Sequence, residues 1–208
     1  MKLPNETHES HFWRIHEIVP DFILEDVWAL PAEGDAEDFE KLLGLLAAAD
    51  PSDAESAATR FLWQLRDRLG SWFGLGRIST PAHGGEEGAR PLTIPGTEET
   101  SLADRLPEDL RETADGVDFA SLPFVPLYRT GDEFAAEISN QTVHGVMHLA
   151  WVEQGEGRYR GQMAVYVKPR GLFGRGYMAA IKPFRYWIVY PALMRQTERT
   201  WNEATATR

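Results

Sequence analysis

Four residues between Glu133 and His148 have the types and the spacing that acid–base chemistry needs. Two glutamates, Glu133 and Glu137, precede two histidines, His144 and His148. The glutamates are four residues apart, and so are the histidines. A carboxylate that holds an imidazole raises its basicity and fixes its orientation, as general acid–base catalysis requires. Tyr166 offers a third hydrogen-bonding group. The sequence therefore makes His144, Glu137 and Tyr166 its candidate catalytic group.

These residues fall in a segment where polar and apolar positions alternate. Two strands joined by a turn at Asn140–Gln141 would place Glu137 opposite His144 and Glu133 opposite His148. One face of this hairpin is then apolar, and a one-residue slip would mix the two faces. Because the apolar face is the one that must be buried, we expect the polar face to be solvent-exposed. A functional pocket on the polar face is the alternative.

Other chemical sites find little support in the sequence. His144 and His148 would lie about 13 Å apart along a strand, too far for one metal ion. His8, His11 and His16 lack the strict spacing of a metal motif. The absence of cysteine excludes thiolate chemistry and disulfides, and no serine stands in a nucleophile-elbow sequence. No metal and no cofactor is implied.

The apolar face of the hairpin, together with a C-terminal helix, offers a site of another kind. Its candidate ligand-binding residues are Phe134, Ile138, Met147, Trp151, Met163, Ile181, Phe184, Trp187 and Ile188. Aromatic and methionine side chains line apolar cavities, but they also fill ordinary cores. Pro183 and Pro191 should bend the helix and loosen its packing, which favours a cavity.

The surrounding elements follow from periodicity and from breaker residues. Residues 1–20 form an arm, and a first strand runs over 22–30 and ends at Pro31. Apolar residues at three- and four-residue spacing predict helices over 35–49 and 53–73. The loop-rich region 75–121 should contain strands near 75–79 and 91–94 and short helical turns around Pro107. Further strands are expected over 124–129 and 159–168, and a long helix over 173–202. A three-residue loop over 154–156 would place Trp151 opposite Tyr159 and Met147 opposite Met163.

Composition limits the class of protein. With 208 residues and 43% hydrophobic residues, the chain fits one globular domain over 1–208. A net charge of −11 argues against a nucleic-acid partner. The segment from Lys168 onward carries +6, which leaves −17 for residues 1–167. This basic segment either docks on its own domain or contacts an anionic membrane or ligand. No signal core and no apolar window of roughly 18 residues is found, so we expect a cytoplasmic protein without a transmembrane segment.

Three runs of the sequence resemble an uncharacterised bacterial domain family. They are RIHEIVPDFILEDVWALP, EISNQTVHGVMHLAWV and GYMAAIKPFRYWIVYPAL. The order of elements resembles the helix-grip fold of the START-like (SRPBCC) superfamily, and the likeness covers most of the chain. It implies an α+β fold with a curved antiparallel sheet wrapped around a long C-terminal helix, preceded by two N-terminal helices. Region 75–121 departs from that pattern because it has loop signals where strands belong.

The resemblance also implies a class of function, although it transfers no catalytic residue. Members of the superfamily bind lipids, polyketides or other hydrophobic small molecules, and some are cyclases. We therefore expect a hydrophobic small molecule or lipid to bind between the sheet and the C-terminal helix. One alternative is a cyclase or hydratase that uses His144, Glu137 and Tyr166. Another is a peripheral membrane or protein interaction module that docks through its basic, aromatic C-terminal segment.

Overall fold

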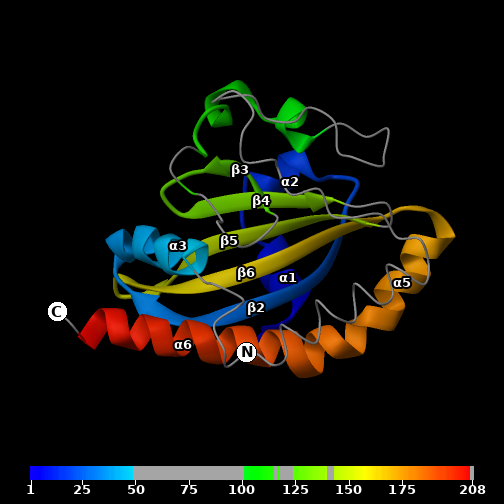
Figure 1. Cartoon of the computed structure of the whole chain (residues 1–208). Helices are drawn as coiled ribbons and strands as arrows, with labels where there is room; N and C mark the ends of the chain where they lie inside the picture. The colour runs from blue at the N-terminus through cyan, green and yellow to red at the C-terminus, as the bar shows by residue number, and fades with distance from the viewer. Residues whose placement is uncertain (49–100, 115–116, 118–123, 140–142, 207–208) are drawn as a thin grey trace.

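The computed structural model of the chain describes residues 1–48, 101–114, 117, 124–139 and 143–206 (Figure 1). Its strands are β1 (Lys2–Leu3), β2 (Ile23–Gly34), β3 (Val125–Arg129), β4 (Glu133–Ser139), β5 (Val143–Gly155) and β6 (Arg158–Pro169). Its α-helices are α1 (Asn5–Glu9), α2 (Ile15–Ile18), α3 (Phe39–Ala47), α5 (Gly171–Phe184) and α6 (Tyr190–Ala206). The 3-10 helices are η1 (Ala36–Asp38), η2 (Leu102–Arg105) and η3 (Glu108–Leu110), and η4 (Arg185–Val189) is a π-helix. The predicted helix over 53–73, the strands near 75–79 and 91–94 and the turn at Asn140–Gln141 lie outside the described residues.

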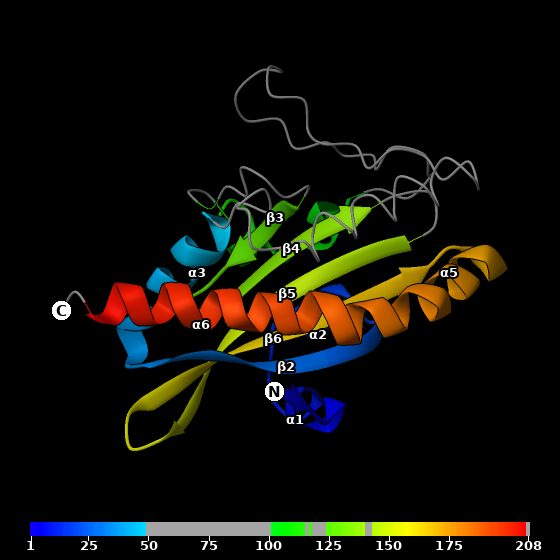
Figure 2. The same ribbon diagram turned by 60° about the horizontal axis from the view of Figure 1, so that its bottom comes forward.

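The described strands form one antiparallel sheet in the order β1-β2-β6-β5-β4-β3. The sheet is curved, and helices cover parts of both its faces (Figures 1 and 2). Residues of α3 and α6 share one hydrophobic core with the sheet, and residues of α2, η2 and η3 share another. The predicted α+β fold with a curved antiparallel sheet and a long C-terminal helix is confirmed.

The alternation of side chains along β4 separates these two cores, as the sequence predicts. Phe134 and Ala136 belong to the core beneath the C-terminal helix, whereas Ala135 belongs to the opposite core. Glu133 and Glu137 share the face of Ala135, because side chains two residues apart point the same way. The sorting of polar and apolar residues onto opposite faces is therefore correct.

The predicted registers are each wrong by two residues. Glu137 pairs with Val146, and His144 pairs with Ser139, so the Glu137 and His144 side chains are diagonal neighbours. In the next ladder Trp151 lies opposite Gly161, and Met147 lies opposite Val165. A shift of two keeps every residue on its face, so the hydrophobic pattern does not distinguish the two registers. In the β5–β6 ladder the turn geometry decides between them.

The turn between β5 and β6 shows that geometry. The strands are joined at Glu156 and Gly157 and not by a three-residue loop over 154–156. Both residues have positive φ, 56° and 70°, the combination that a tight hairpin turn with right-handed strand twist requires. Gly157 adopts this conformation without a steric penalty.

Strand β2 continues through Pro31 to Gly34 instead of ending at Pro31. Its ladder with β6 shifts register between Ala29 and Glu33. A proline lacks the N–H of a regular ladder and is tolerated at such an irregularity. The longer strand carries the chain to the capping box of Asp35 and Asp38, where η1 and α3 begin.

The C-terminal helix is continuous but changes its winding between the two prolines. Pro183 stands near the end of α5, and Pro191 is the second residue of α6. Between them the N–H of Tyr190 donates to the carbonyl of Arg185, five residues earlier, as in a π-turn. A proline removes an N–H and crowds the carbonyl four residues before it, so a wider turn relieves the clash.

Candidate functional site

The polar face of the β4–β5 hairpin is buried. The exposed fractions of His148, His144, Glu137 and Glu133 are 0%, 1%, 3% and 4%. His148 Nε2 donates to Glu133 Oε2 across 3.0 Å, and His144 Nε2 donates to Glu137 Oε2 across 2.9 Å. The two predicted carboxylate–imidazole contacts are therefore confirmed, whereas the expectation of a solvent-exposed face is wrong.

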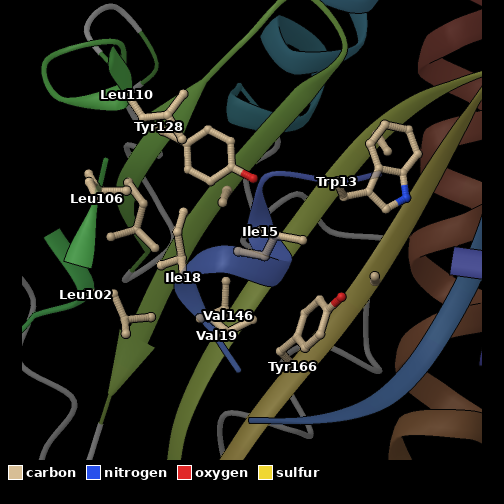
Figure 3. Close-up of a cluster of buried hydrophobic side chains, with 14 of the residues drawn as sticks. Trp13, Ile15, Ile18, Val19, Leu102, Leu106, Leu110, Tyr128, Val146 and Tyr166 are labelled. Carbon is tan, nitrogen blue, oxygen red and sulfur yellow. The ribbon is translucent and has the colours of Figure 1, made fainter. Parts of the chain in front are cut away.

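The face is buried because other segments of the chain cover it. Figure 3 shows the N-terminal arm and the segment of η2 and η3 packed over the strands. The covering apolar side chains are Trp13, Ile15, Ile18, Val19, Leu102, Leu106 and Leu110. They meet Tyr128, Val146 and Tyr166 of the sheet in one hydrophobic cluster. The sequence gives this face too few apolar residues to predict a core, and only the covering segments complete it.

The two glutamates anchor the covering segments. Glu133 accepts the backbone N–H of Arg14 at 3.0 Å and the hydroxyl of Tyr128 at 2.8 Å. Glu137 accepts the backbone N–H of Leu102 at 3.1 Å and also a hydrogen bond from the hydroxyl of Ser101. Each carboxylate thus binds one histidine of the sheet and one backbone group of a covering segment. Such hydrogen bonds offset the cost of burying the charge.

Next to Glu133, four aromatic or imidazole rings, one of them that of His148, surround His8 of α1. The ring centre of His8 lies 5.0 Å from that of His148, 5.5 Å from that of His16 and 5.8 Å from that of Tyr166. Trp13 stacks on His8 at 5.9 Å. His8 Nδ1 donates to the side-chain oxygen of Gln162 at 2.7 Å. We call these residues, with Glu133 and His148, the His8 cluster.

The surroundings of His8 and His16 disfavour protonation of these two imidazoles. Burial lowers the pKa of His8 to about 3, and the neighbouring His148 adds to this effect. Burial also lowers the pKa of His16. Burial opposes ionisation of Glu133, but hydrogen bonds from His148, Arg14 and Tyr128 outweigh it and lower its pKa. At neutral pH the cluster therefore holds an ionised Glu133 beside a neutral His8.

The arrangement gives little support to the predicted catalytic group. His144 and Glu137 are in contact, but Tyr166 packs against His8 and His16. All three lie on the face of the sheet away from the C-terminal helix. They therefore do not line the space between sheet and helix that the cyclase or hydratase hypothesis requires. The contacts of Glu137 with η2 instead describe a group that positions the chain.

The sheet residues of the predicted ligand-binding set lie on the face that the C-terminal helix covers, and the members of the set differ in burial. Phe134, Trp151 and Met163 are fully buried core residues, with exposed fractions of at most 4%. Those that are partly exposed are Ile138, Met147, Ile181, Phe184 and Ile188. Trp187 is 80% exposed and does not line the sheet–helix interface.

One polar group on this face escapes sequence reasoning. Asp26 of β2 is fully buried and accepts hydrogen bonds from Arg185 at 2.6 Å, from Tyr190 at 3.0 Å and from Tyr186. Burial raises the pKa of Asp26, and Arg185 acts against this rise. The contacts hold the π-helix η4 against the sheet. The available signal was a lone aspartate in an apolar strand, together with a tyrosine–arginine cluster in the helix.

Two further features of the described residues concern ligands. A surface hollow of about 600 Å³ lies beside the β5–β6 turn, and its lining includes Glu33, Asp35, Arg158 and Tyr159. It shares no residue with the His8 cluster or with the predicted ligand-binding set. Within the described ranges, no three His, Asp or Glu side chains are arranged to hold a metal ion.

Comparison with known proteins identifies a family. The model of a family described as proteins of unknown function (DUF2867) matches residues 18–192. The chain belongs to the DUF2867 family. The DUF2867 region includes Asp26, both carboxylate–imidazole pairs and helix α5, whereas His8 and His16 precede it. No curated protein and no solved structure matches the chain. Among the helices that the structure describes, none has the length and apolar character to span a bilayer.

Proposed function

We propose that this DUF2867 protein binds a hydrophobic small molecule or lipid between its sheet and the α5 end of its C-terminal helix. The observation that carries the proposal is a difference in burial along one apolar interface. Beneath α6 and α3, Phe39, Leu149 and Trp151 are at most 2% exposed. Toward α5, apolar residues of both sheet and helix remain partly exposed: Ile138, Met147, Val165, Ile181, Phe184 and Ile188.

The bend of the helix accounts for this difference. Asp26 fixes η4 to β2, and beyond this anchor α5 continues past the strands toward the loop after β6 (Figure 2). The π-turn between Pro183 and Pro191 changes the direction of the helix at the same place. Side chains that face the sheet from α5 are consequently packed less closely than those of α6. An apolar ligand would bury the area that the described residues leave uncovered.

The chemistry of the interface favours an apolar ligand. The six partly exposed residues are aliphatic apart from Phe184 and the flexible Met147. Methionine and branched aliphatic side chains adapt to apolar shapes without supplying a fixed hydrogen bond. The resemblance to the START-like superfamily, whose members bind hydrophobic molecules, supports the same class of ligand. The helix-grip relationship itself is part of this proposal.

Native mass spectrometry of the gently purified protein, with its organic extract analysed in parallel, is the first test. We expect a stoichiometric adduct of an apolar molecule. Binding is then measured by calorimetry with dodecanoic acid and by fluorescence with N-phenylnaphthylamine. The Ile138→Trp variant fills the interface, and Ile188→Glu places a charge in it. A loss of about 1.4 kcal/mol of binding free energy corresponds to roughly tenfold weaker binding.

The matched control is Ile23→Glu, because Ile23 is an apolar side chain that is already 58% exposed. Thermal unfolding of each variant separates lost binding from lost folding. The proposal is contradicted if the protein carries no adduct and binds neither probe. It is also contradicted if all three variants bind the probes with the affinity of the unmodified chain.

A further inference from the structure

The outer side of α5 carries an apolar stripe that no described residue covers. Leu172 is 84% exposed, and Trp187, in η4, is 80% exposed. Between them the exposed positions at three- and four-residue spacing are Gly176, Ala179, Ala180 and Pro183. This spacing keeps the residues on one side of the helix. We call this set the outer stripe.

Trp187 differs from the other tryptophans that the structure describes. Trp13, Trp28, Trp151 and Trp201 are each at most 9% exposed. A tryptophan left in solvent exposes a large apolar ring with one polar N–H, and this side chain is favoured at membrane–water interfaces. Trp187 lies on the same stripe as Leu172 and the alanines, so its exposed ring is part of one apolar surface.

The charged residues around the outer stripe indicate what kind of surface it would contact. No acidic residue occurs between Lys168 and Thr197, whereas this segment contains six basic residues. Lys168 and Lys182 pair with Asp21 and Glu25 of the body. Arg175, which lies three residues after Leu172, is exposed and has no ion pair among the described residues. The acidic remainder of the chain would orient this side toward negative charge.

We propose that the outer stripe, with Arg175, docks on an anionic membrane surface. Leu172 and Trp187 would enter the interfacial layer while Arg175 meets lipid headgroups, as in other amphipathic interfacial helices. The proposal uses exposed residues of the helix, whereas the proposed ligand site uses partly buried ones. The two can therefore be tested and refuted separately.

The experiment is vesicle co-sedimentation of the full chain. One set of vesicles contains phosphatidylcholine alone, and the other an equal mixture of phosphatidylcholine and phosphatidylserine. We expect binding to the mixed vesicles only, and loss of that binding at 1 M salt, where the Debye length is about 3 Å. Arg175→Gln should weaken binding roughly fivefold, the effect of about 1 kcal/mol for one cation near such a surface.

The double variant Leu172→Glu, Trp187→Glu should abolish sedimentation with the vesicles. Both residues are exposed, so its thermal unfolding should match that of the unmodified chain. Phe12→Glu is the matched control, because Phe12 is a fully exposed apolar residue of the N-terminal arm. It should bind vesicles like the unmodified protein.

Several results would overturn the assignment. They are an absence of vesicle binding, equal binding to neutral and mixed vesicles, and an equal loss of binding in the Phe12→Glu variant. Sedimentation velocity adds one more. If the unmodified chain self-associates, fails to bind vesicles and becomes monomeric in the double variant, the stripe contacts a second copy and not a membrane.

Discussion

Replacement of His8 by asparagine should reduce the loss of stability that the protein suffers when the pH is lowered. His8 is fully buried among Trp13, His16 and His148, and burial lowers its pKa from 6.5 to about 3. The unfolded chain therefore takes up this proton at a higher pH than the folded chain. Stability is retained above pH 6.5 and is lost as the pH falls from 6.5 toward 3.

The size of the effect follows from the two pKa values. At pH 4 the unfolded chain is almost fully protonated at this site, and the folded chain is protonated in roughly one molecule in ten. Between pH 6.5 and pH 4 the unfolded chain thus holds a proton that the folded chain mostly lacks, over about 2.5 pH units. At about 1.4 kcal/mol per unit, this lowers the free energy of unfolding by about 3 kcal/mol.

The assay is urea unfolding at pH 7.5 and at pH 4, followed by tryptophan fluorescence. Asparagine does not titrate, and its side-chain amide can still donate to Gln162 as His8 Nδ1 does. The variant should be less stable at pH 7.5, because it loses ring contacts, but it should lose about 3 kcal/mol less between the two pH values. His11→Asn is the matched control, since His11 is exposed on the same arm.

The comparison between variants cancels the contributions of titrating groups that lie far from His8. Such groups are present in the unmodified chain and in both variants, so their contributions subtract out. The reasoning is refuted if His8→Asn and the unmodified chain lose the same stability between pH 7.5 and pH 4. It is equally refuted if His11→Asn changes the pH dependence as much as His8→Asn does.

Three other substitutions test the anchors and the packing. Glu137→Ala should destabilise the protein by roughly 3–5 kcal/mol in urea unfolding, because it leaves His144 and the N–H of Leu102 without their buried acceptor; a loss below about 1 kcal/mol would show that Glu137 anchors nothing. Gly161→Ala should cost about 1–3 kcal/mol, since an added Cβ would lie 2.9 Å from Leu42 Cδ2. Gly44→Ala in α3 meets nothing within 4 Å and should instead raise the melting temperature, through a gain of about 0.5–1 kcal/mol; equal losses in both glycine variants would contradict this account.

The sequence alone determined which residues share a face. Alternation along 133–139 and 143–153 sorted Phe134 and Met147 from Glu133 and His148, because successive side chains of a strand point to opposite sides. The contact of Glu137 with His144 followed from the same pattern. Proline positions also indicated where the C-terminal helix would depart from regular winding, at Pro183 and Pro191.

The tertiary structure alone decided the registers and the fate of the polar face. A two-residue shift preserves every facing, so the hydrophobic pattern leaves open which partner stands opposite Glu137. Burial of a polar face depends on segments distant in sequence, such as Arg14 and Leu102, whose backbone N–H groups bind its carboxylates. Such long-range contacts leave no periodic signal in the strands themselves. The sequence of the two strands does not show whether water or the chain's own N-terminal arm covers a carboxylate–imidazole pair. In this protein, folding places the arm over it.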